Sequence, residues 1–260
     1  MSFLESLKPD DVVLFAGTHA DDETLIGPLL AYCADHCREV VVSCMTRGES
    51  GHNLTREDLT HTLSQVREME FRASVGAFGG LPIMLDYVNG TSRAHPGGLA
   101  VLDPDPQAQA RWRAAVSQTP DEICARWTNQ TGDPVVALLA LLRHKRPSIV
   151  ITLDLEGGYT GHVEHVATAR ATVEAVRAYN ADREPKAVLY CACDWTDASK
   201  DGEHILTSDL NRLGGKDYVA LAEECRAFYE SQFGVRSGGG GGSYVTKRAP
   251  EALLLRVDAG

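Results

Sequence analysis

Short apolar runs recur along most of the chain, separated by polar or amphipathic stretches. Continuous apolar runs bounded by turn residues are typical of strands that are buried on both faces, as in a parallel sheet. Such runs predict strands over residues 11–18, 39–45, 81–87, 147–153, 187–193 and 253–257. The last of these is expected at an edge of the sheet.

The stretches between these runs are predicted to be helices. They cover residues 23–37, 56–78, 134–143, 162–179 and 217–233. In the first of them Leu25, Leu29 and Tyr32 recur three or four positions apart, which places them on one helical face. The alternation of strands and helices predicts an α/β protein with a doubly wound, mostly parallel sheet and right-handed crossovers.

Two segments interrupt this alternation. Residues 89–133 are rich in proline and glycine around one expected helix near 107–127, and we interpret them as an insertion over the core. Residues 237–243 are five glycines between two serines, a composition typical of flexible segments. They form either a mobile loop beside a site or a surface connection. The 260 residues otherwise fit a single domain.

The composition narrows the range of functions. Apolar residues make up 43% and charged residues 23% of the chain, as in ordinary globular proteins. The formal net charge of -11 disfavours partners such as nucleic acid and anionic membranes. No apolar run approaches the roughly 20 residues that span a membrane. Residues 1–8 lack a signal-peptide pattern, so a cytoplasmic protein is expected.

The seven cysteines show no regular framework, and paired CxxC units are absent. We therefore expect reduced thiols rather than disulfides or a cysteine zinc site.

A cluster of ionisable residues follows the first predicted strand. His19, Asp21, Asp22 and Glu23 fall within five positions, at the carboxyl end of a strand, where open α/β sheets bind ligands. Crowded carboxylates raise each other's pKa, and a divalent cation offsets that cost. The alternative is a helix N-terminus, with Asp21 or Asp22 as its capping residue.

A second cluster follows the strand predicted over 147–153. His162 and His165 are three positions apart at a predicted helix start, so they share one face. Both clusters are expected at the same edge of the sheet. Two histidines and one carboxylate leave a fourth position for water, which is the pattern of a catalytic zinc site.

These motifs resemble those of the PIG-L/LmbE-like N-deacetylase superfamily. His19-Ala-Asp-Asp-Glu23 matches its His-Pro-Asp-Asp-Glu signature except at the second residue, and Gly161-His-Val-Glu-His165 matches its Gly-His-x-x-His motif. Weaker matches are the loop at 46–51, the Arg67-x-x-Glu70 helix and the Ser231-Gln232 pair. The resemblance extends from about residue 11 to 235. It implies a Rossmann-like sheet with helices on both faces, and the segment 89–133 is its least covered part.

The resemblance also implies roles for individual residues. The implied zinc ligands are His19, Asp22 and His165. Asp21 is the implied general base for the attacking water. His162, expected to be cationic, would stabilise the oxyanion or assist protonation of the leaving amine. Arg67 is expected to line the substrate pocket or support the site.

The sequence departs from the family pattern near the substrate. Ala20 replaces the proline of the signature, which removes no ligand. Asn89 stands where family members often carry a substrate-contacting acid, and Asp86 lies close enough in sequence to replace that acid. Tyr159 is a candidate pocket residue. Asn89 and Tyr159 therefore join Arg67 as expected substrate contacts.

The leading hypothesis is a zinc-dependent hydrolase that removes an N-acyl group, most simply acetyl, from an amino-sugar-containing small molecule or natural-product glycoside. One alternative is an amidase that cleaves thiol-glycoside conjugates. Another is a non-catalytic nucleotide- or sugar-binding module, which the lack of a GxGxxG turn after the first strand disfavours for dinucleotides. The predicted ligands also accept other divalent metals. A homo-oligomer is possible, and the sequence does not identify the acyl group.

Overall fold

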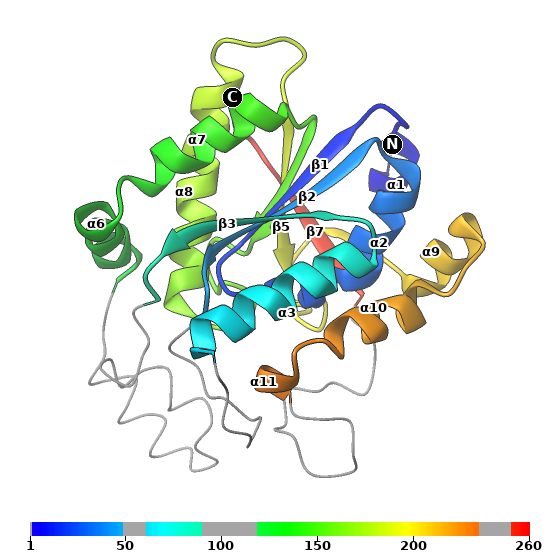
Figure 1. The fold of residues 1–260 in the computed structure, drawn as a ribbon. Helices are drawn as coiled ribbons and strands as arrows, with labels where there is room; N and C mark the ends of the chain where they lie inside the picture. The colour runs from blue at the N-terminus through cyan, green and yellow to red at the C-terminus, as the bar shows by residue number, and fades with distance from the viewer. Residues whose placement is uncertain (1, 49–60, 90–118, 234–250) are drawn as a thin grey trace.

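A central sheet with helices on both faces organises the chain (Figure 1). The structure is a computed structural model that describes residues 2–48, 61–89, 119–233 and 251–260. The beginning of the helix predicted at 56–78, most of the insertion at 89–133 and the glycine-rich segment 237–243 lie outside these residues.

The described strands form one seven-stranded sheet in the order β3-β2-β1-β4-β5-β7-β6. Their bounds are β1 Val12–Gly17, β2 Glu39–Thr46, β3 Leu81–Tyr87, β4 Ile149–Leu153, β5 Val188–Cys193, β6 Glu203–Ile205 and β7 Ala252–Val257. Strands β1 to β5 are parallel, whereas β7 is antiparallel to β5 and β6. This confirms the predicted mostly parallel α/β sheet.

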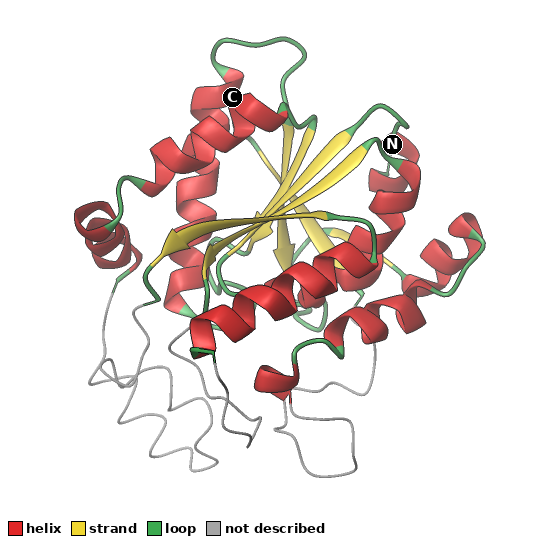
Figure 2. Cartoon of the chain, in the orientation of Figure 1, coloured by secondary structure: helices red, strands yellow, loops and turns green. Residues whose placement is uncertain are grey.

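The helices pack in two layers, drawn in red against the yellow sheet in Figure 2. Their bounds are α1 Phe3–Ser6, η1 Asp22–Ile26, α2 Gly27–His36, α3 Leu63–Ala77, α6 Pro120–Gln130, α7 Pro134–Lys145, α8 Val163–Asn180, α9 Thr207–Gly214, α10 Tyr218–Arg226 and α11 Glu230–Phe233. Helices α1, α2, α3, α9 and α10 contribute to the core on one face of the sheet, and α6, α7 and α8 to the core on the other.

Several element boundaries differ from the prediction. The segment 23–37 divides into a 3-10 turn, η1, and the helix α2, with Pro28 in the first turn of α2. Helix α3 starts only at Leu63, because the side chain of Thr62 caps it and Gln65 completes a reciprocal capping box. The segment 217–233 divides into α10 and α11.

The prediction that 253–257 forms an edge strand is wrong. Strand β7 lies between β5 and β6, and the three-residue strand β6 forms the edge in its place. A strand this short leaves too few positions for a visible apolar pattern in the sequence. Helix α9 was missed as well.

Two further expectations concern the thiols and the membrane. All seven cysteines are free thiols, as predicted. Within the described ranges, no helix is long and apolar enough to cross a membrane.

The sheet topology brings the two ionisable clusters together. Strands β1 and β4 are parallel neighbours, with Ala16 paired to Thr152 near their carboxyl ends. The turn that carries residues 19–23 and the loop that carries residues 154–165 therefore leave the sheet at the same edge. This confirms that the clusters meet in space.

Candidate metal and catalytic site

The turn after β1 is organised by the carboxylate of Asp22. Its Oδ2 atom accepts hydrogen bonds from the backbone N–H groups of Thr18, at 2.7 Å, and His19, at 2.9 Å. The helix-capping alternative is wrong, because Asp22 lies inside η1 and the side chain of Asp21, at the N-cap, makes no capping hydrogen bond. Asp21 instead has a φ of 122°, a conformation that is strained for any residue with a Cβ atom.

Three histidines lie around one point at this edge of the sheet. The ring centroids of His19, His162 and His165 are 4.6 to 5.0 Å apart. One ring nitrogen from each lies within 4.8 Å of the other two. His19 comes from the turn after β1, whereas His162 caps α8 and His165 lies in its first turn.

The hydrogen bonds of His19 and His165 determine which ring nitrogens remain available. His165 donates from Nδ1 to the carbonyl oxygen of Gly158, at 2.6 Å, and His19 donates from Nε2 to Oε2 of Glu164, at 2.9 Å. The remaining nitrogens, Nδ1 of His19 and Nε2 of His165, face each other at 2.9 Å. Two lone pairs at this distance repel, so the arrangement calls for a proton or a cation between them. This is the geometry that suits a metal ion.

Asp22 offers a third group that could bind a metal ion. Its Oδ1 atom lies 3.2 Å from Nε2 of His165, while its other oxygen is held by the backbone. The third histidine is oriented differently, because Nδ1 of His162 accepts the backbone N–H of Glu164 at 3.2 Å. A neutral His162 therefore carries its proton on Nε2 and presents a donor. Two imidazole nitrogens and a carboxylate oxygen are a donor set that divalent zinc accepts.

Burial and neighbouring charges shift the pKa values of two of these histidines, His19 and His162. Burial lowers the pKa of His19, but the hydrogen bond to Glu164 and the charge of Asp22 outweigh it and raise the value to about 9. Burial and the charges of His19 and His165 lower the pKa of His162 to about 3. These effects favour the neutral imidazole of His162 near pH 7, which runs against the expectation of a cationic side chain.

The two adjacent aspartates respond in opposite directions. Burial and the charge of Asp22 raise the pKa of Asp21, although Arg67 opposes the shift. Burial also acts to raise the pKa of Asp22, but the charge and hydrogen bond of His165 outweigh it and lower the value. The pair thus combines a firmly ionised carboxylate with a more basic one.

The expected substrate contacts occupy different surroundings. Arg67 is buried in α3, and burial lowers its pKa while the charge of Asp21 opposes that shift. Asn89 is buried just beyond β3. The hydroxyl of Tyr159 donates to the carbonyl of Leu25 at 3.2 Å, which ties this loop to η1. Asp86 forms an ion pair with Arg47.

A buried polar cluster beside the site was not predicted in full. Glu23 Oε1 accepts from the hydroxyl groups of Tyr229, at 2.5 Å, and Ser74, at 2.7 Å. Burial raises the pKa of Glu23 to about 7, although both hydrogen bonds oppose the shift. Glu70 accepts from the backbone N–H and hydroxyl of Ser231. The Arg67-x-x-Glu70 and Ser231-Gln232 motifs signalled part of this cluster, whereas nothing in the sequence pointed to Tyr229.

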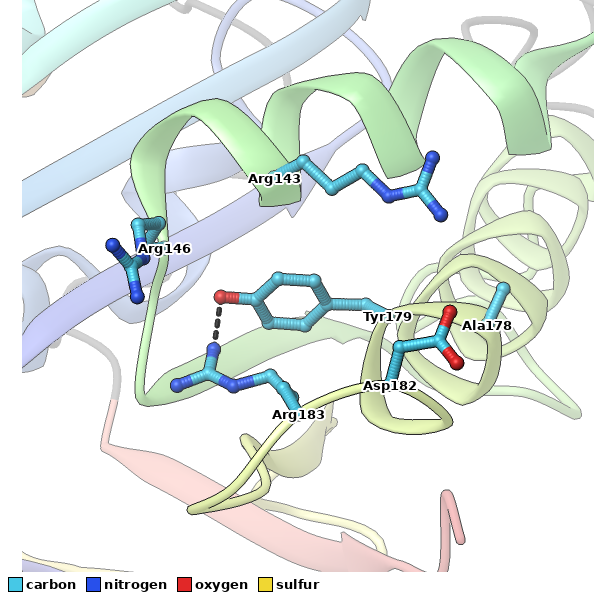
Figure 3. Close-up of a pocket in the computed structure, with 6 residues that line it drawn as sticks. All are labelled: Arg143, Arg146, Ala178, Tyr179, Asp182 and Arg183. Atoms are coloured by element: carbon cyan, nitrogen blue, oxygen red, sulfur yellow. Dashed lines mark hydrogen bonds between the residues drawn. The ribbon is translucent and has the colours of Figure 1, made fainter.

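A surface hollow of about 200 Å³ lies near the amino ends of the parallel strands, whereas the histidines lie at their carboxyl ends (Figure 3). The residues lining it come from the C-terminal ends of α7 and α8, which lead into the beginnings of β4 and β5. They are Arg143, Arg146, Ala178, Tyr179, Asp182 and Arg183. This hollow is therefore distinct from the histidine cluster.

The fold and site define an α/β protein with a group of residues that could hold a metal ion, at the carboxyl ends of its parallel strands. The sequence profile of PIG-L, described as GlcNAc-PI de-N-acetylase, matches residues 12–176. The chain belongs to this family of deacetylases.

Similar proteins include a 1D-myo-inositol 2-acetamido-2-deoxy-alpha-D-glucopyranoside deacetylase from Rhodococcus opacus. It is 30% identical over 184 residues, which are 67% of this chain and 56% of that protein. In a relative of the same name from Corynebacterium urealyticum, the matched region is 47% of that protein. The chain thus spans about half the length of the curated relatives it matches.

Solved structures share the fold at low sequence identity. The N,N'-diacetylchitobiose deacetylase from Pyrococcus horikoshii superposes with a TM-score of 0.59 at 17% identity, covering 96% of this chain and 84% of that chain. A deacetylase of the teicoplanin biosynthesis pathway also superposes with a TM-score of 0.59. It is 15% identical, and the match covers 95% of this chain and 99% of that chain.

Proposed function

We propose that this chain is a zinc-dependent N-deacetylase that hydrolyses the acetamide of an amino-sugar-containing small molecule. The observation that carries the proposal is the pair of facing nitrogens, Nδ1 of His19 and Nε2 of His165, at 2.9 Å. Each ring is fixed by a hydrogen bond from its other nitrogen, as metal-binding histidines usually are.

The proposed zinc ligands are His19, Asp22 and His165. Asp22 is preferred over His162 because the Nδ1 atom of His162 already accepts a backbone N–H, which leaves a protonated Nε2. When bound, zinc would polarise the amide carbonyl and lower the pKa of water to roughly 7.

The remaining steps are assigned to side chains next to these ligands. Asp21 directly precedes Asp22, and its charge interacts with those of Arg67, His19 and His165. We assign it the role of accepting the proton of the attacking water. His162, through Nε2–H, would donate a hydrogen bond to the carbonyl oxygen as negative charge develops.

The proposed substrate class rests on the named relatives. The Rhodococcus protein acts, by its name, on a 2-acetamido-2-deoxy-glucopyranoside of inositol, and the Pyrococcus protein on diacetylchitobiose. Both carry an acetamide on a pyranose ring. We therefore propose an N-acetylated glucosamine unit as the part of the substrate that enters the site, with Arg67, Asn89 and Tyr159 as candidate contacts.

The test is the release of primary amine from a panel of N-acetylated glucosamine compounds, including the inositol glycoside and diacetylchitobiose. Purified protein is assayed as prepared, after removal of metal by a chelator, and after addition of zinc. The proposal predicts amine release that is lost on chelation and restored by zinc. Release that persists unchanged in metal-free protein would contradict it, and release only from thiol-glycoside conjugates would change the substrate class.

A further inference from the structure

A chain of buried charges links helix α6 to His19. The guanidinium of Arg126 donates from Nη2 to Oε1 of Glu164, at 2.5 Å, and Oε2 of Glu164 accepts from Nε2 of His19, at 2.9 Å. The three residues lie in α6, α8 and the turn after β1. The side chain of Glu164 is fully buried, while those of Arg126 and His19 are 15% and 12% exposed.

Glu164 can hold His19 only while its own charge is balanced. A buried carboxylate that loses its partner moves, draws in water or takes up a proton, because an uncompensated charge in the interior is costly. Each of its two oxygens has a separate role here: one accepts from Arg126 and the other from His19. Removing Arg126 would therefore disturb the group that sets the orientation of the His19 ring.

Helix α6 is well placed to fix this arginine. The side chains of Ile123 and Trp127 are buried, and the indole N–H of Trp127 donates to the carbonyl of Val88 at 3.0 Å. Arg126 lies between these two anchors in sequence. The helix begins at a capping box formed by Thr119 and Glu122, so its position does not depend on Arg126 alone.

We propose that Arg126 is a positioning residue for the metal site: it holds Glu164 so that Glu164 keeps Nδ1 of His19 directed at Nε2 of His165. This inference rests on the proposed function, because it takes those two nitrogens to be metal ligands. It assigns α6, which lies outside both histidine motifs, an influence on metal affinity.

The experiment measures zinc affinity by competition with a chromogenic chelator. The variants are Arg126→Met, Arg126→Lys, Glu164→Gln and the double variant Arg126→Met/Glu164→Gln. The matched control is Arg170→Met, because Arg170 forms the exposed ion pair between the same two helices, with Asp121 at 3.4 Å. A role in docking α6 alone would lower the unfolding free energy of the metal-free protein and leave zinc affinity unchanged.

We expect Arg126→Met to weaken zinc binding about 10- to 100-fold, as for other groups that support a metal ligand. Arg126→Lys should fall between this variant and the wild type, and Arg170→Met should match the wild type. The double variant should bind zinc about as tightly as the single variant with the lower affinity. The two effects should not add, because both changes act through one contact. In the zinc-loaded protein, the imidazole N–H resonance of His19 should exchange with water faster after Arg126→Met.

Zinc affinity of Arg126→Met equal to that of the wild type would overturn the inference and leave the proposed function intact. If Arg126→Met does not fold, Arg126→Lys decides in the same way, with unchanged zinc affinity counting against the inference. A wild-type protein that binds no zinc would instead contradict the proposed function itself.

Discussion

Nδ1 of His19 lies 2.9 Å from Nε2 of His165, although the two residues are 146 positions apart in the chain. The parallel pairing of β1 with β4 brings their loops together, and a carboxylate and a carbonyl oxygen hold the opposite ring nitrogens. These two hydrogen bonds fix the orientations of both imidazole rings. Such an arrangement lowers the reorganisation needed when an ion binds.

The third metal ligand can be identified by comparing Asp22→Asn with His162→Gln. Substitution of groups that only support a ligand already costs about 10- to 100-fold in metal affinity, so loss of a ligand should cost at least as much. We expect Asp22→Asn to lose zinc in competition with a chelator. His162→Gln should keep zinc affinity close to wild type and lower kcat by about 10²- to 10³-fold.

The reverse pattern, with zinc lost on His162→Gln and kept on Asp22→Asn, would make His162 the third ligand.

Asp21→Asn tests the general base. The change keeps the size of the side chain and removes its ability to accept a proton, so kcat/KM should fall about 10²- to 10⁴-fold. Zinc content, measured by atomic emission, should remain that of the wild type. Asp209→Asn is a control, since it removes an exposed carboxylate that pairs with Arg212 on α9, outside the turn and the loop that carry the histidines. Undiminished turnover in Asp21→Asn would remove Asp21 from the mechanism.

The backbone conformation of Asp21 predicts that glycine at this position gives a more stable protein than alanine. Its φ of 122° is strained for residues with a Cβ atom, by about 1–3 kcal/mol, but not for glycine. Asp21→Gly should therefore be more stable to urea than Asp21→Ala by about 1 kcal/mol. At an unstrained position, alanine would be the more stable of the two. Both variants should lack activity, and equal midpoints would argue against strain at this turn.

Tyr229→Phe tests the buried cluster around Glu23. The variant removes a hydroxyl that donates to the buried carboxylate at 2.5 Å, so the unfolding free energy should fall by about 1–3 kcal/mol. The control is Tyr190→Phe, because the Tyr190 hydroxyl makes no hydrogen bond within the part of the chain that the structure describes. The unfolding free energies of both variants are measured by urea unfolding. Equal decreases in the two variants would mean that the hydrogen bond to Glu23 does not stabilise the protein.

The sequence predicted the fold and the central residues of the site better than the contacts around them. Strand–helix alternation indicated the parallel sheet, and the topology then required that residues 19–23 and 162–165 meet. The pairing of Glu164 with Arg126 could not be predicted, because it depends on how α6 packs against α8. The neutral state of His162 likewise depends on burial that no motif encodes.

The short elements were missed for a different reason. Strand β6 has three residues and is held by its pairing with β7, so its own sequence carries little signal. The break between η1 and α2 falls at Ile26, and Pro28 in the first turn of α2 is a helix-start signal that the sequence does carry.

The most direct test is a crystal structure of the zinc-loaded protein, with anomalous data collected on both sides of the zinc absorption edge. The account predicts one zinc peak, about 2.0–2.2 Å from Nδ1 of His19, Nε2 of His165 and Oδ1 of Asp22. His162 should keep its hydrogen bond to the N–H of Glu164. The absence of a zinc peak between His19 and His165 in crystals grown with zinc would contradict the account.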